Sequence, residues 1–133
     1  MNQMITEAKE LAQEYLKNAY APYSNFKVAA IVIGENAYYA GVNIENASYG
    51  LTNCAERNAL FNAIGAGEKP GSLKQLVIYT DTDTITTPCG ACRQVMQELM
   101  SVDGEIYMFC RNDSKKMTIR ELLPSDFNKE KLK

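Results

Sequence analysis

The chain has 133 residues, of which 46% are hydrophobic and 23% are charged, and its formal net charge is −2. This balance predicts one globular domain over residues 1–133 and excludes a disordered chain. The acidic balance argues against a nucleic-acid partner, which usually needs a basic face. Lys129, Lys131 and Lys133 alternate with other residues near the end, and we interpret them as a solvated tail.

The composition also restricts location and chemistry. No apolar run approaches the ~20 residues that span a membrane, and the opening MNQMITEAKE lacks the apolar core of a secretion signal. We therefore expect a cytoplasmic protein with no membrane partner, whose four cysteines are thiols or metal ligands. The chain has no histidine, which excludes His-dependent triads and HExxH metal sites. Any zinc must then be held mainly by sulfur.

The first half of the chain predicts a helix, a hairpin and a second helix. Apolar residues at helical spacing cover 3–20 and stop at the Ala-Pro-Tyr-Ser-Asn stretch 21–25. Segments 26–33 and 38–45 are rich in β-branched and aromatic residues, which predicts an antiparallel hairpin. A helix is predicted over 53–64, and the GAGEKPGS loop after it lacks the spacing of a phosphate-binding loop.

The second half predicts the rest of one sheet. A buried strand is expected over 76–82, a helix from Thr87 with that residue as N-cap and Pro88 in its first turn, and a strand over 105–110. The following connection is too short for a crossover, so a strand near 115–118 must pair antiparallel. Thr118 and Glu121 match a capping box for a last short helix. The expected fold is α/β, with one mixed five-stranded sheet flanked by helices.

Two cysteine stretches carry the chemistry. TNCAERNA places Cys54 two residues before Glu56, and TPCGAC places Cys89 and Cys92 at CxxC spacing. At a helix start, free N–H groups and the helix dipole favour the thiolate, which is the form that binds metal. A CxxC pair alone is typical of redox and metal sites alike, and Cys54 shifts the interpretation toward zinc. Three protein ligands leave the fourth tetrahedral position open, as in catalytic zinc sites.

The neighbouring residues have structural as well as functional interpretations. Cys110 lies in a predicted strand, where a small buried side chain is favoured over a fourth ligand. Glu56 alone would be a first-turn glutamate stabilised by the helix dipole, but beside an open zinc it can reach a metal-bound water. Arg57, or alternatively Arg93, can donate to a cysteine sulfur and offset the thiolate charge, whereas a surface salt bridge is the structural alternative for either.

The motifs resemble a known family. C-A-E followed by P-C-G-A-C resembles the zinc-dependent nucleoside and nucleobase deaminases. FKVAA at 26–30, NIENASYG at 43–50 and RELLPSDF at 120–127 are similar to the small homotetrameric cytidine deaminases. The resemblance implies a three-layer sandwich, one zinc ion per subunit and a homotetramer with shared active sites. It also implies hydrolysis of cytidine and deoxycytidine to the uridines, with release of ammonia, in pyrimidine salvage.

The resemblance assigns roles residue by residue. Cys54, Cys89 and Cys92 match the zinc ligands, and Glu56 matches the glutamate that moves the proton of the zinc water to N3 and then to the departing ammonia. The substrate-binding matches are Phe26 on the pyrimidine ring, the Ala55 backbone on the base, Asn43 and Glu45 on the ribose hydroxyls, and Tyr49 and Phe127 reaching in from neighbouring subunits. Ala29 departs from the glycine common in the family, and we expect its methyl to shift the strand near the pocket.

Several alternatives stay open. Within the deaminases they are a cytosine-bearing antibiotic, a base in tRNA or DNA, and deoxycytidylate, which would need a cationic phosphate pocket. A structural zinc module predicts a fourth protein ligand and no use for Glu56. A thiol redox protein predicts metal-free activity that depends on Cys89 and Cys92 alone.

Overall fold

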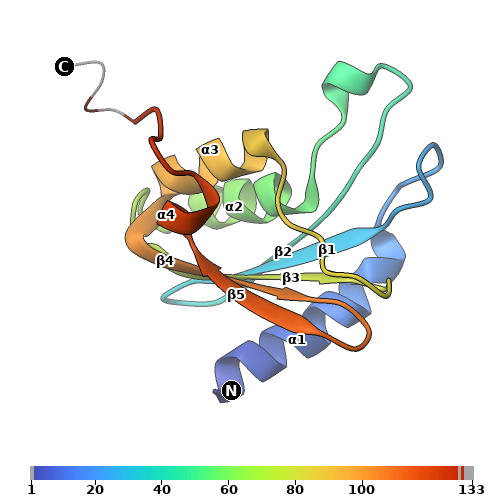
Figure 1. Cartoon of the computed structure of the whole chain (residues 1–133), viewed down its shortest axis with the longest axis horizontal. Helices are drawn as coiled ribbons and strands as arrows, with labels where there is room; N and C mark the ends of the chain where they lie inside the picture. Colours follow the sequence, from blue (N-terminus) through green and yellow to red (C-terminus); the bar gives the residue numbers. More distant parts are fainter. Residues whose placement is uncertain (1, 129, 131–133) are drawn as a thin grey trace.

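One five-stranded sheet organises the chain (Figure 1), in a computed structural model that describes residues 2–128 and Glu130. Its strands, in spatial order, are β2 (Tyr38–Val42), β1 (Val28–Ile33), β3 (Leu73–Thr80), β4 (Met100–Phe109) and β5 (Ser114–Thr118). β3 and β4 pair parallel, and the other neighbours pair antiparallel. The predicted mixed sheet, its hairpin and the antiparallel β5 are therefore confirmed. The lysines interpreted as a solvated tail lie outside the described residues.

Helices cover both faces of the sheet, which gives three layers (Figure 1). Side chains alternate along β1: Val28, Ala30 and Val32 pack toward α2 (Ala55–Gly65) and α3 (Gly90–Leu99), together with α4 (Ile119–Leu122). The intervening Ala29, Ile31 and Ile33 pack against α1 (Gln3–Tyr15). All of β1 is buried because it lies inside the sheet with a helix layer on each side. This arrangement confirms the expected three-layer sandwich.

Several element boundaries differ from the predictions. α1 ends at Tyr15 and continues as one 3₁₀ turn, Leu16–Asn18, instead of reaching residue 20. β2 ends at Val42, and Ile44 beyond it makes isolated bridges. β4 begins at Met100, five residues before the predicted start at 105, because backbone pairing with β3 extends past its apolar part.

Two local predictions hold. Thr118 Oγ1 accepts a hydrogen bond from the Glu121 amide at 3.2 Å, and the Glu121 carboxylate accepts one from the Thr118 amide at 2.9 Å, so the capping box is present. The loop after α2 turns through Gly67 and Gly71, whose φ angles are +108° and +86°. Within residues 2–128 and Glu130, no helix has the length and apolar character to cross a membrane.

Gly41 lets α2 lie directly on β2. A Cβ atom at this position would lie 2.3 Å from the backbone nitrogen of Ala59 and 2.5 Å from the carbonyl oxygen of Ala55. Real Cβ contacts do not occur at such distances, so a side chain here would push the helix away. The position of α2, which carries Glu56 in its first turn, therefore depends on this glycine.

Two asparagines hold α2 to the same strand. Asn58 Nδ2 donates to the carbonyl of Val42, and Asn62 Nδ2 donates to the carbonyl of Ala40, both at 2.8 Å. Residues four apart lie on one face of a helix, so the two amides follow the strand on either side of Gly41. Because β2 is an edge strand, these bonds also occupy carbonyl groups that another chain could otherwise pair with.

We predict that Gly41→Ala lowers the free energy of unfolding by about 3 kcal/mol, at the upper end of overpacking effects, because the neighbouring atoms belong to the α2 backbone. Chemical denaturation followed by circular dichroism measures this change. Gly65→Ala is the matched control, since a Cβ atom added at Gly65 would have no neighbour within 4 Å. Equal stability of the two variants would show that the close approach does not constrain α2.

Candidate metal centre

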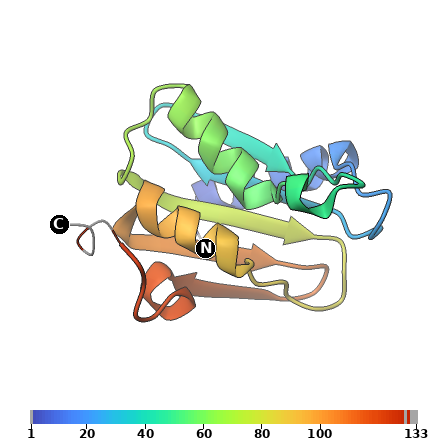
Figure 2. The same cartoon turned by 90° about the horizontal axis from the view of Figure 1, so that it is seen from above.

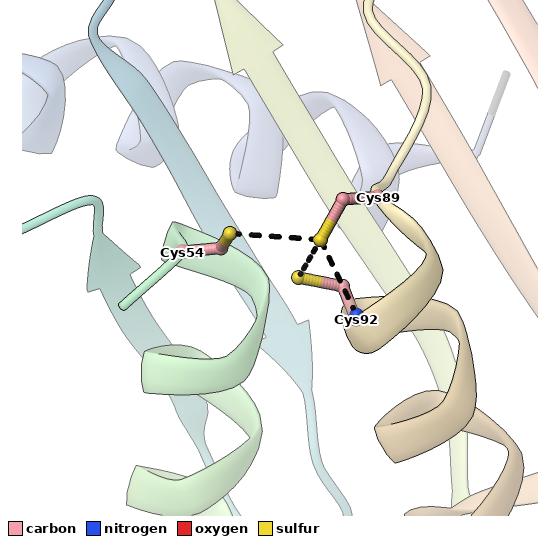
Figure 3. A group of neighbouring side chains, drawn as sticks. All are labelled: Cys54, Cys89 and Cys92. Carbon is pink, nitrogen blue, oxygen red and sulfur yellow. Dashed lines mark hydrogen bonds between the residues drawn. The ribbon is translucent and has the colours of Figure 1, made fainter. Parts of the chain in front are cut away.

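Three cysteine sulfurs meet where α2 and α3 begin. Figure 3 shows Cys54 at the start of α2 pointing toward Cys89 and Cys92 at the start of α3. The Cys54 and Cys89 sulfurs lie 3.7 Å apart, and the Cys89 and Cys92 sulfurs 3.3 Å apart. All three lie within 4.8 Å of one another. Stretches far apart in sequence thus supply one cluster of thiols.

The helix caps differ from the prediction in a way that matters for the site. The sequence predicts Thr87 as the cap of α3 with Pro88 in its first turn, but Cys89 is the N-cap and Pro88 precedes it. The Cys89 sulfur accepts from the Cys92 amide at 3.5 Å, in the place where a hydroxyl usually acts. Cys54 likewise occupies the N-cap position of α2, although its side chain makes no capping hydrogen bond. Both cap sulfurs therefore sit at the positive ends of helix dipoles.

The cluster fits a tetrahedral zinc ion. Zinc–sulfur bonds of about 2.3 Å place neighbouring ligand sulfurs about 3.8 Å apart in a tetrahedron, close to the separation of Cys54 and Cys89. Among the described residues, no fourth Cys, His, Asp or Glu ligand atom joins the group. Cys110 is buried just beyond β4, with its sulfur near the carbonyls of Asp83 and Asp113. The three sulfurs thus leave one coordination position for a non-protein ligand.

An arginine contacts the cluster from α2. Arg57 Nη2 donates to the Cys54 sulfur at 3.5 Å, which places a positive charge beside the thiols. Arg93, the alternative donor, is engaged elsewhere: its Nε donates to the Pro88 carbonyl and its Nη1 to the Leu122 carbonyl, both at 2.7 Å. Arg93 therefore ties α3 to the C-terminal segment.

Hydrogen bonding between the thiols shifts the pKa values of Cys54 and Cys92 in opposite directions. A hydrogen bond from Cys92 lowers the pKa of Cys54 to about 5, although burial opposes the shift and Arg57 and Cys89 assist it. The same interaction raises the pKa of Cys92, with burial adding to the effect. The Cys54 sulfur is thus prepared as a thiolate, the form in which cysteine binds metal.

Glu56 is a buried carboxyl group beside the cluster. It lies in the first turn of α2 and is only 6% exposed. Burial raises its pKa to about 7, against smaller opposing effects from its own backbone amide and from Cys92. A carboxyl group with a pKa near neutrality can both accept and return a proton under physiological conditions.

A pocket of about 240 Å³ opens over the thiols. Its lining includes most of the residues predicted from the sequence: Phe26, Asn43, Glu45, Cys54, Ala55, Glu56 and Cys89. The sequence reasoning missed Ser24, Val28, Thr52, Thr86 and Thr87 as lining residues. Each is within two residues of a predicted position except Thr86, which precedes Cys89 by three residues; for Thr87 the pattern indicated only helix capping.

Asn43, one of the two predicted ribose-binding residues, is held by the backbone at residues 26 and 28. Asn43 Oδ1 accepts from the Val28 amide at 2.9 Å, and its Nδ2 donates to the Phe26 carbonyl at 2.8 Å.

Ala29 packs on the α1 side of the sheet, whereas Val28 lines the pocket. The expected disturbance by the Ala29 methyl is therefore directed away from the pocket.

Two of the predicted substrate-binding residues lie outside this pocket in the single chain. Tyr49 is 80% exposed and lines an adjoining hollow of about 360 Å³, which shares Ser24, Glu45 and Thr52 with the pocket. Phe127 is 59% exposed, and its backbone carbonyl accepts from Gln94 Nε2 at 2.6 Å. Neither aromatic ring lines the pocket of its own chain.

The chain matches known proteins over nearly its whole length. The family model described as "Cytidine and deoxycytidylate deaminase zinc-binding region" matches residues 2–109. A cytidine deaminase of Halalkalibacterium halodurans is 44% identical, over 96% of this chain and 95% of that protein, and one of Sporosarcina psychrophila is 40% identical over 99% and 94%. A crystal structure of cytidine deaminase from Burkholderia pseudomallei superposes with a TM-score of 0.88 at 42% identity, covering 96% of this chain and all of that one.

These matches agree with the structure in two respects: the fold of the chain and the zinc chemistry of the cysteine cluster. The matched region is defined by zinc binding, and the three sulfurs with an open fourth position fit a zinc ion. With the sheet, the thiol cluster and the relatives taken together, the chain belongs to the zinc-binding cytidine and deoxycytidylate deaminase family.

Proposed function

We propose that the protein hydrolyses cytidine and deoxycytidine to uridine and deoxyuridine, releases ammonia and serves pyrimidine salvage. The observation that carries the proposal is the position of Glu56, a buried carboxyl group in the same pocket as an open three-sulfur cluster. The relatives named as cytidine deaminases support the choice of a cytosine nucleoside.

Each part of the pocket has a task in this reaction. Cys54, Cys89 and Cys92 hold one zinc ion per chain, which when bound lowers the pKa of a water and so supplies a nucleophile for C4 of the base. Glu56 would accept a proton from the attacking water, deliver it to ring nitrogen N3 as the C4–O bond forms, and carry the second proton of the water to the amino group. The C4–N bond then breaks, ammonia leaves and the base becomes uracil.

The remaining lining residues orient the nucleoside. Phe26 packs on the pyrimidine ring, and the backbone of Ala55, in the first turn of α2, reads the base edge. Asn43 and Glu45, which line the same pocket, receive the ribose hydroxyls. Arg57 holds the Cys54 sulfur and offsets part of the negative charge of three thiolates.

Specific observations disfavour the alternatives. A structural zinc module needs a fourth protein ligand, and the described residues supply none within the cluster. A substrate carrying a phosphate needs a cation, whereas the described pocket lining contains no Lys or Arg. The net charge of −2 disfavours nucleic-acid substrates.

We further propose a homotetramer whose subunits share active sites. Tyr49 stands on an exposed 3₁₀ turn, Tyr49–Leu51, beside the pocket mouth, and Leu51 is exposed as well. Large exposed apolar side chains in one place are typical of interaction surfaces. The single-chain pocket is also smaller than the ~300 Å³ at which ligand sites usually start, so further walls from neighbours suit it.

The domain and its location complete the proposal. We take residues 1–133 to form one functional domain, supported by a single sheet with a core on each face. A cytoplasmic location is supported by the four cysteines, which form no disulfide within the described residues.

We expect each of Cys54→Ser, Cys89→Ser and Cys92→Ser to weaken zinc binding by more than about 100-fold, since each removes one of three ligands. Zinc per chain, measured by atomic emission after dialysis against a metal buffer, checks this. Cys110→Ser is the control and should keep one zinc per chain. Zinc retained by all three variants would overturn the ligand assignment.

For Glu56→Gln we expect the zinc content and melting temperature to be kept while kcat falls by about 10² to 10⁴, because the proton carrier is lost. Ammonia and uridine released from cytidine are measured for the wild type and the variant. Glu10→Gln, which changes an exposed glutamate of α1, should leave the rate unchanged. Full turnover by Glu56→Gln would contradict the proton-carrier role.

If sites are shared, co-expressed Glu56→Gln and Phe127→Ala chains should form mixed tetramers that recover about a quarter of wild-type activity. The recovered sites combine Glu56 of one chain with Phe127 of another. Sedimentation velocity gives the subunit number in the same samples. A monomeric enzyme, or a mixture no more active than its parents, would refute shared sites.

A further inference from the structure

The turn before β1 makes a set of hydrogen bonds to Glu45. The Glu45 carboxylate accepts from the backbone amides of Tyr23 and Ser24 at 3.0 and 3.1 Å through Oε1. Its other oxygen, Oε2, accepts from the Ser24 hydroxyl. Three donors of one turn therefore hold a side chain that lies some twenty residues further along the chain.

The same hydroxyl also fixes the turn itself. Ser24 Oγ accepts from the Phe26 amide at 3.0 Å, a local bond that serine favours in turns. Asn25 between them has a φ of 59°, in the left-handed region that asparagine tolerates better than most residues. Ser24 thus joins the carboxylate of Glu45 to the backbone of the aromatic residue that lines the pocket.

These bonds leave Glu45 ready for a ligand. A carboxylate accepts about four hydrogen bonds, and the turn uses three of them. The hydrogen bond from the Ser24 side chain lowers the pKa of Glu45, so the group is ionised at neutral pH. The free acceptor site belongs to a residue that lines both the pocket and the adjoining hollow.

We propose that Ser24 is a positioning residue for sugar recognition, whose hydroxyl holds the Glu45 carboxylate in the orientation that accepts a ribose hydroxyl. This inference rests on the proposed function, because it needs Glu45 to bind the sugar. Ser24 touches no reacting atom and acts through Glu45. A hydroxyl is required, since it donates to the carboxylate and accepts from the Phe26 amide at once.

The test compares two substrates that differ only in the sugar. Wild type, Ser24→Ala, Glu45→Gln and the double variant are assayed with cytidine and with 2′,3′-dideoxycytidine, which lacks the hydroxyls that Glu45 would bind. We expect Ser24→Ala to lower kcat/KM for cytidine about tenfold, mostly through KM, as for the loss of one hydrogen bond to a charged group. The value for the dideoxynucleoside should change less than about twofold. Ser24→Thr keeps the hydroxyl and should restore at least half of the loss.

A matched control separates positioning from stability. Ser72→Ala removes another turn hydroxyl bond, from Ser72 Oγ to the Lys69 carbonyl at 2.6 Å, remote from the pocket lining. It should leave the ratio of the two substrates unchanged. If Ser24→Ala does not fold, Ser24→Cys, which keeps a weaker donor, takes its place. If the dideoxynucleoside is not turned over, its inhibition constant against cytidine replaces kcat/KM.

The results have distinct meanings. A double variant no worse than Glu45→Gln supports action through Glu45. Equal losses on both substrates, or independent effects of the two substitutions, would overturn the positioning role and leave Ser24 a structural turn residue. If the wild type releases no ammonia from cytidine, the proposed function itself fails, whereas normal turnover with an unaffected Ser24→Ala refutes this inference alone.

Discussion

The structure depends on the meeting of two helix N-termini over one end of the sheet. In the chain, β3 follows α2 and α3 follows β3. Both helices therefore run antiparallel to β3 and begin beside its carboxyl end (Figure 2). Cys54 and Cys89 occupy the two N-cap positions, which brings sulfurs 35 residues apart in sequence to 3.7 Å. Ligand sites in open α/β sheets form at this end for the same topological reason. β3 and β4 pair parallel, which requires a crossover connection, and α3 provides it.

Placing a buried carboxyl group beside three thiols is electrostatically costly, and the fold offsets that cost locally. Two helix dipoles and the guanidinium of Arg57 face the sulfurs. Glu56 responds to burial by holding its proton to a higher pH. Burial therefore has two effects on Glu56: it costs free energy, and it gives the carboxyl group a pKa near neutrality, which suits a group that accepts and returns a proton.

The pocket wall is built by side chains as much as by the sheet. Asn43 holds the backbone at Phe26 and Val28, and the Ser24 turn holds Glu45. These hydrogen bonds join the segment 24–28 to the segment 43–45. Residues that are expected to contact the substrate therefore also hold the pocket wall together. On the other side, Gly41 sets how closely α2 approaches the edge strand.

By itself, the sequence determined the elements and the chemistry. Alternating and helical periodicities predicted the five strands and the helices, because the spacing of apolar residues along the chain indicates which side chains are buried. The absence of histidine and the three cysteines beside Glu56 indicated a sulfur-held metal with an open position, since only those residue types could supply it. Boundaries such as the start of α3 failed, because Cys89 took a capping role that Thr87 suits better by propensity.

Tertiary structure decided what depends on distance between remote segments. The sequence did not distinguish Arg57 from Arg93 as the donor to a cysteine sulfur. In the folded chain, Arg57 donates to Cys54 and Arg93 donates to the Leu122 carbonyl. Ser24 gave no signal beyond that of a turn, because its partner Glu45 lies 21 residues away. Local propensity encodes which element a residue joins, whereas its partner across the fold is chosen by how the elements pack.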